Sequence, residues 1–221
     1  MEISHVCLGA QNLYEAAYRL REETGLESYD GGWFRAGMAV RFVPVGDDQF
    51  IEVESLIDPR MAERIRGAEY FGDFPDYLRS ATVHGDALIG WCVRVNSAGE
   101  LEQIARRLGR HGIGPRRGSS IRPDGRQRSG FAFPPSSETW PRGVPTVVFY
   151  PDPEDRPGAG QAAHRVAPSG IAWLELGGDE AEVRDFLGPE GEHLPLRFVG
   201  GAAGVRAVAI ATDDGEIVIR R

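Results

Sequence analysis

The chain has 221 residues, enough for one large domain or two small ones with a hydrophobic core. Its formal net charge of −8 argues against nucleic acid as a partner, because a phosphate backbone binds clustered basic side chains. No stretch approaches the roughly 20 apolar residues of a membrane span, and residues 1–20 lack the basic and apolar regions of a signal peptide. We therefore expect a soluble, cytoplasmic protein without membrane contact, whose Cys7 and Cys92 are free thiols.

One pattern of secondary structure occurs three times along the chain. An alternating strand leads into a short amphipathic helix and then into further strands, over residues 2–56, 88–150 and 169–221. Each copy reads as βαβββ, a unit that must bury its open face against another unit. The sequence therefore predicts an α+β fold in which repeated βαβββ modules form curled mixed sheets around a cleft, with helices on the outer face.

The first copy begins with a strand over residues 3–8 that places His5 and Cys7 on one face. A helix is predicted from about Asn12, with Gly25 just after its end. Residues 40–45 and 50–54 then form a hairpin around a turn at 46–48. The hairpin's second strand places Glu52 and Glu54 on one face.

Residues 57–87 do not fit the repeat, and we expect a connecting excursion. Its aromatic side chains (Tyr70, Phe71, Phe74 and Tyr77) fit either a lid over the cleft or an ordinary surface helix. In the second copy a helix is predicted after Ser97, which has the capping-box spacing to Glu100. A proline-rich loop follows at 134–145, and a linker rich in Pro, Gly and Ala at 151–168 separates residues 1–150 from the third copy.

A local basic stretch lies within the second copy of this acidic protein, in which Arg greatly outnumbers Lys. Its members are Arg106, Arg107, Arg110, Arg116, Arg117, Arg122, Arg126 and Arg128. The stretch fits either a solvated surface or a rim that attracts anions.

The order of these motifs resembles the glyoxalase-like domain of the vicinal oxygen chelate superfamily. The segments that carry the likeness are residues 4–6, 41–47, 50–53, 88–91, 122–125 and 144–148, with His164 and residues 168–171 where the family's last segment begins. The resemblance implies a cup of paired βαβββ modules, which often holds a divalent metal. Its typical ligands are a His on the first strand and a Glu on the last strand of each module. His5 and Glu52 match those positions, with Glu54 as a competitor for the second.

The second module departs from the family's ligand pattern. Gly90 falls opposite His5, Cys92 falls opposite Cys7, and the closing strand at 146–150 has no carboxylate. The third unit offers no ligand either, so half of the set is left. An imidazole with one or two carboxylates and open positions suits Zn, Ni, Fe or Mn. The sequence is compatible with one divalent metal and also with none.

Glu52 and Glu54 are the candidate catalytic residues. Two carboxylates on one buried face repel each other, which raises the pKa of one of them and makes it a candidate general base. If the hairpin is exposed instead, both carboxylates are solvated.

Arg94, Cys7 and Tyr150 are the candidates for ligand binding. Arg94 shares a face with Cys92, so we expect it to point into the same cleft. There it either sets the polarity for a ligand or forms an ion pair with Glu52 or Glu54 in place of a metal.

Three functions follow from these residues. The leading hypothesis is a protein that binds a small oxygen-bearing metabolite in the cup. The second is a metal-dependent lyase, isomerase or dioxygenase with His5 and Glu52 as metal ligands. The third is a protein-interaction module. In any of these, the unpaired sheet surface of the third unit would pack on the first two units or form a homodimer.

Overall fold

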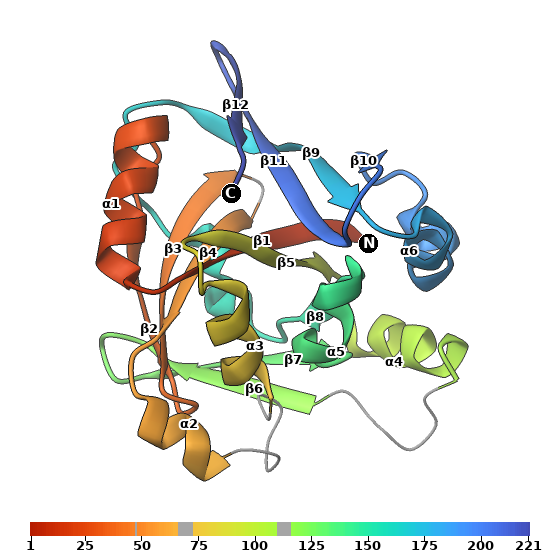
Figure 1. Ribbon diagram of the computed structural model, residues 1–221. Helices are drawn as coiled ribbons and strands as arrows, with labels where there is room; N and C mark the ends of the chain where they lie inside the picture. Colours follow the sequence, from red (N-terminus) through yellow and green to blue (C-terminus); the bar gives the residue numbers. More distant parts are fainter. Residues whose placement is uncertain (47, 66–72, 110–115) are drawn as a thin grey trace.

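The computed structural model describes residues 1–46, 48–65, 73–109 and 116–221 (Figure 1). Within this part of the chain the first two units form one closed barrel, with the strand order β1-β4-β3-β2-β6-β7-β8-β5. The third unit forms a separate sheet in the order β10-β9-β11-β12. The α+β class, with curled mixed sheets and helices outside, is confirmed.

The first unit consists of one helix and four strands. These are β1 (Glu2–Ala10), α1 (Leu13–Thr24), β2 (Tyr29–Phe34), β3 (Met38–Gly46) and β4 (Gln49–Leu56). The side chain of Asn12 accepts hydrogen bonds from two backbone N–H groups at the start of α1, and Gly25 ends the helix with a φ of 75°. Both predicted helix ends are therefore confirmed. Residue 47 in the predicted hairpin turn lies outside the described residues.

The second unit repeats this order around the other half of the barrel. It contains β5 (Ala87–Arg94), α4 (Ala98–Arg107), β6 (Arg116–Ile121), β7 (Gln127–Phe133) and β8 (Thr146–Phe149). Ser97 accepts a hydrogen bond from the backbone of Glu100, whose carboxylate accepts one from Asn96, so the predicted cap of α4 is present. β1 pairs in parallel with β4 and antiparallel with β5, which joins the two units.

The described part of the excursion at 57–87 reaches the cavity through α3 (Phe74–Ala81). It also contains α2 (Pro59–Ile65). A side chain at Gly9 of β1 would meet Leu78 and Thr82 at 2.9 Å, so α3 lies directly against β1. Phe74 is buried there and lines the cavity of the barrel. Tyr70 and Phe71 lie outside the described residues.

The segment at 151–168, expected to be a linker, packs against the barrel. It contains two short turns, η2 (Pro153–Asp155) and η3 (Pro157–Ala159). A Cβ at Gly158 would lie 2.1 Å from the backbone of Asp48, so only glycine permits this close approach. Arg156 adds an ion pair of 2.8 Å to Asp48. The proline-rich loop also holds short helices, α5 (Ser136–Thr139) and η1 (Trp140–Arg142).

The third unit has the predicted element order but a different strand pairing. Its elements are β9 (Pro168–Gly177), α6 (Glu180–Leu187), η4 (Pro189–Gly191), β10 (Leu196–Val199), β11 (Gly204–Thr212) and β12 (Gly215–Ile219). β9 pairs in parallel with β10, whereas β1 pairs in parallel with the last strand of its unit. The expectation of a true third copy is therefore wrong in topology.

The third sheet covers one side of the barrel (Figure 1). Leu174 and Val208 belong to the same hydrophobic core as Val6 and Trp91, which alternation places on the outer side of the barrel wall. Burying this apolar face explains why the third sheet packs on the barrel. Among the described residues no helix is long and apolar enough to span a membrane.

We predict that Gly90→Ala destabilises the fold, because Gly90 is where the ring of Trp140 packs on β5. An added Cβ would lie 1.9 Å from the Trp140 ring, and both residues are buried. Overpacking of this kind costs about 1–3 kcal/mol. The measurement is the free energy of unfolding in a chemical denaturant.

Gly99→Ala is the matched control, because the space around Gly99 in α4 is open. Combining Gly90→Ala with Trp140→Leu should recover part of the lost stability. A Gly90→Ala protein as stable as the wild type would contradict the packing described.

Candidate metal and ligand site

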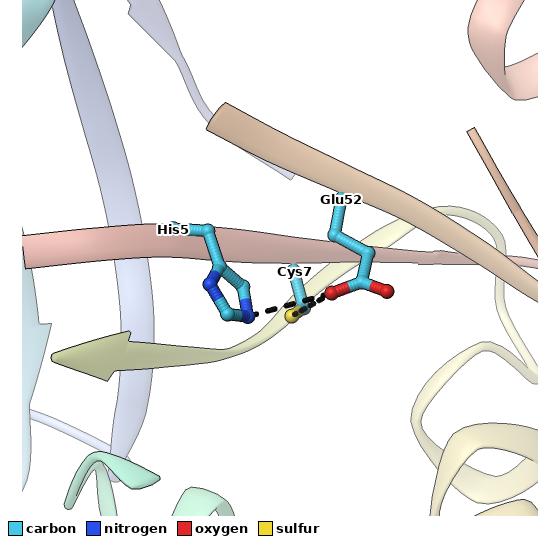
Figure 2. Close-up of side chains that lie close together, drawn as sticks. All are labelled: His5, Cys7 and Glu52. Atoms are coloured by element: carbon cyan, nitrogen blue, oxygen red, sulfur yellow. Dashed lines mark hydrogen bonds and ion pairs between the residues drawn. The ribbon is translucent and has the colours of Figure 1, made fainter. Parts of the chain in front are cut away.

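His5, Cys7 and Glu52 come together inside the barrel (Figure 2). β1 supplies His5 and Cys7, and the parallel register places Cys7 opposite Glu52 of β4. The Nε2 of His5 lies 3.4 Å from Glu52 Oε2, and the Sγ of Cys7 lies 3.9 Å from the same oxygen. One donor atom from each residue lies within 4.8 Å of the others. The structure thus brings together two residues that the sequence paired and adds Cys7 to them.

Burial sets the protonation of this group. It lowers the pKa of His5 to about 3, so the imidazole is neutral at pH 7. The ring stacks on Phe50 at 4.4 Å, and its Nδ1 lies 3.0 Å from Ser4 Oγ. Burial also raises the pKa of Cys7 well above its usual value, and the carboxylates of Glu54 and Glu52 raise it further. In the absence of a cation, Cys7 is therefore a thiol.

Glu52 and Glu54 are both buried, which is one of the two alternatives predicted for this strand. Burial raises the pKa of Glu52 to about 7, although the nearby charge of Arg128 lowers it. The pKa of Glu54 is raised well above its usual range, first by burial and then by the charge of Glu52. Within the described residues Glu54 Oε1 has no hydrogen-bond partner. A buried carboxyl group with a free acceptor atom is thus available at the cavity wall.

The donors on this wall fit a divalent metal. A neutral imidazole, a thiol and a carboxyl group provide N, S and O ligands, a set that suits Zn or Fe better than Mn because of the soft sulfur. A bound cation would also favour the ionised forms of Glu52 and Cys7, which burial alone disfavours. The unpartnered oxygen of Glu54 shows that this buried polar group is not satisfied by the protein itself.

Within the part of the chain that the structure describes, the donor group includes no residue of the second module, for a reason visible in the packing. Gly90 of β5 occupies the position that corresponds to His5 of β1, and the ring of Trp140 fills the space beside it. Thr146 lies opposite Cys92 in the parallel register, as Glu52 lies opposite Cys7. The hydroxyl of Thr146 donates to the carbonyl of Pro134. An indole and a threonine thus stand where the first module has His5 and Glu52.

The donor group adjoins a cavity of about 110 Å³. His5, Glu52, Glu54 and Tyr150 line it, together with Cys92. Cys7 is buried next to Glu52, as one of the group's donors, and is not itself a lining residue. Five of the remaining lining side chains are aromatic: Phe34, Phe42, Phe74, Phe131 and Trp140.

Arg94 lies elsewhere, and the expectation that it shares the cleft with Glu52 and Glu54 is wrong. Its guanidinium pairs with Glu2 at 2.8 Å and with Asp48 at 3.4 Å. Arg94 is the last residue of β5, opposite Glu2 at the start of β1, and it lines a separate open recess with Asp48 and Gly158. Strand alternation gave the correct face, but η3 lies between this end of the barrel and the cavity.

Arg128 is the cationic residue of the cavity, and it went unrecognised within the basic stretch. Arg128 lies on β7, opposite Ser120 of β6, and only 8% of its surface is exposed. Its guanidinium lies 4.9 Å above the ring of Phe42, and its Nη1 donates to the carbonyl of Gly31 at 3.2 Å. Alternation alone does not distinguish Arg128, because Arg126 lies two residues earlier and has the same strand parity.

Other members of the basic stretch do stand on the surface. Arg122 pairs with Asp155, Arg126 pairs with Asp124, and Arg107 donates to the last carbonyls of α6. The side chains of Arg110, Arg116 and Arg117 lie outside the described part of the chain.

Comparisons with known proteins agree with this fold. The structure of a hypothetical protein from Staphylococcus aureus superimposes with a TM-score of 0.71 at 9% identity, covering 94% of this chain and 89% of that one. The Mn(II)-bound glyoxalase from Novosphingobium aromaticivorans superimposes with a TM-score of 0.53 at 11% identity, covering 98% of this chain and 81% of that one. The 2,3-dioxygenase LapB from Pseudomonas sp. KL28 superimposes with a TM-score of 0.50 at 15% identity, covering 95% of this chain and 74% of that one. At such low identities these likenesses establish the fold alone.

The sequence itself also matches a family. No curated protein matches it, but the family model of the glyoxalase-like domain matches residues 3–187, which include both modules of the barrel and the start of the third unit. The chain therefore belongs to the glyoxalase-like domain family.

Proposed function

We propose that this protein binds one divalent metal ion through His5 and Glu52, with Cys7 as a third donor, and acts as an enzyme on a small oxygen-bearing substrate. The observation that carries the proposal is the convergence of these three donor groups beside a cavity. A divalent metal bound there would polarise oxygen atoms of the substrate. Two of the three donors line the cavity, so a substrate in it lies next to the site.

Among the reactions considered, proton transfer of the lyase or isomerase type suits the residues best. Glu54 is buried, lines the cavity and has a free oxygen, so it can take or give a proton at that atom. The aromatic side chains of the lining reduce the contact of the reacting groups with water. A non-haem iron oxygenase uses two His and one carboxylate, whereas the donor group found among the described residues has one His. We therefore favour proton transfer over dioxygenase chemistry.

Support for a metal also comes from the fold. One structural neighbour is a glyoxalase with bound Mn(II). In this chain the sulfur of Cys7 favours Zn or Fe, with Ni and Mn as further candidates.

Binding of a metabolite without a metal is the second candidate. The observation in its favour is that Trp140 and Thr146 take the places of two ligands, so that one module alone would hold the ion. A protein-interaction module is less well supported, because the cup contains a cavity rather than a core filled by side chains. A cytoplasmic location and a homodimer stay predictions.

Metal analysis separates the first two candidates. Protein purified without chelator should contain about one equivalent of a divalent metal. His5→Ala and Glu52→Gln should each lose most of it, because each removes a ligand. Cys7→Ser should weaken binding and shift the preference from Zn towards Mn. The measurement is elemental analysis of the purified proteins.

His193→Ala is the control for this experiment, because His193 is exposed and its Nε2 forms a hydrogen bond with the backbone oxygen of Met1, away from the donor group. It should retain the metal of the wild type. Full metal content in both ligand variants, or no metal in the wild type even after loading, would refute the proposed site.

The pH dependence of stability gives a second test. Because the pKa of Glu52 is higher in the fold than its ordinary value of 4.5, Glu52 stabilises the metal-free fold at low pH. This contribution is fully present below pH 4.5 and is lost as the pH rises through about 7. Gln cannot ionise, so in chelator Glu52→Gln should gain stability relative to the wild type between pH 5 and 8, by up to about 3 kcal/mol. His5, whose lowered pKa acts in the opposite direction, is present in both proteins and cancels.

Chemical denaturation at each pH measures this difference. With a bound metal the sign should reverse, because only the wild type has the carboxylate ligand. Glu63→Gln is the control, since Glu63 is exposed. A difference between Glu52→Gln and the wild type that stays constant across the window would show that Glu52 is not buried as described.

A further inference from the structure

Arg128 is a buried guanidinium without an ion-pair partner. It is more than nine-tenths buried and lines the cavity, and no carboxylate oxygen of the described residues lies within 4.0 Å of it. The ring of Phe42 and the carbonyl of Gly31 offset only part of its charge. Burying an uncompensated charge is costly, and an anion in the cavity would relieve that cost.

The free edge of this guanidinium has the geometry for a carboxylate. Nη1 is occupied by the carbonyl of Gly31, whereas Nε and Nη2 make no hydrogen bond within the described part of the chain. These two nitrogens form one edge of the planar group, whose parallel N–H bonds match the two oxygens of a carboxylate.

Arg128 also stands across the cavity from the donor group. Glu52 lies on β4 and Arg128 on β7, which are four strands apart in the closed barrel in either direction. A ligand between these walls would have one polar end on each. The space of about 110 Å³ accommodates on the order of ten non-hydrogen atoms, and its aromatic walls favour an apolar body.

With the proposed metal function, on which this step rests, Glu52 would be engaged by the divalent ion and would not offset the charge of Arg128 across the cavity. An anionic ligand beside Arg128 would offset that charge.

We propose that the cavity binds a small organic carboxylate, with the carboxylate on Arg128 and an apolar body among the aromatic side chains. Arg128 is then the residue that selects charged over neutral substrates. Its position on β7 makes this selection independent of the metal ligands, which come from β1 and β4.

Benzoate and benzamide provide a matched test, because they share size and shape and differ in charge. Titration calorimetry on metal-loaded and metal-depleted protein should show benzoate binding at least about 10-fold more tightly. Arg128→Gln should weaken benzoate by about 10- to 100-fold, the range for hydrogen bonds to charged groups, and leave benzamide unchanged. Arg128→Lys should keep the preference with reduced affinity. Arg126→Gln is the control, because Arg126 lies on the same hairpin but is exposed.

The possible results are distinct. Equal binding of both probes, no binding of benzoate, or an unchanged preference in Arg128→Gln that is folded by thermal melting would overturn the inference. Tighter binding of inorganic phosphate than of benzoate at Arg128 would also overturn the inference. Metal content of the same proteins tests the proposed function separately. If Arg128→Gln loses the preference for benzoate over benzamide and keeps its full metal content, the carboxylate site is supported. If the wild type has that preference but contains no metal, only the proposed metal site is refuted.

Discussion

The two-sided pairing of β1 is the constraint on which the rest of the structure depends. β1 pairs in parallel with β4 inside its own unit and antiparallel with β5 of the next unit. The first register sets Cys7 beside Glu52, and the second sets His5 beside Cys92. Because side chains alternate along a strand, a slip of one residue in either register would turn His5 and Cys7 out of the barrel. The same shift would expose Val6 and Leu8 to the cavity and remove them from the outer core.

The features predicted correctly from the sequence are those with a periodic signal. Alternation in residues 3–8 and 50–54 predicted which faces His5 and Glu52 occupy, and the repeat predicted that the two strands belong to one module. The cap residues Asn12 and Ser97 act as expected, because a helix start is decided by a few neighbouring residues. Local chemistry and pattern are sufficient for such features.

What could not be predicted depends on contacts between segments far apart in the chain. Arg94 has the expected strand face, but its partners Glu2 and Asp48 are set by where β5 ends in the barrel. Trp140 comes from a loop without periodicity, yet it fills the place of a ligand beside Gly90. Arg128 was one of eight arginines in a basic stretch, and only the closed barrel shows that its side chain turns inward. The third unit has the expected elements, but element order does not determine which strand edges meet.

The asymmetry between the two modules has a chemical consequence. One wall keeps imidazole, thiol and carboxyl groups, whereas the other presents an indole and a threonine whose hydroxyl is already used. An ion held by one wall has its remaining coordination positions on the cavity side, where a ligand can enter them. The indole of Trp140 closes off the space that further protein ligands would need. The indole and the threonine thus leave the donor group on one wall and, at the same time, shape a cavity that ends at Arg128.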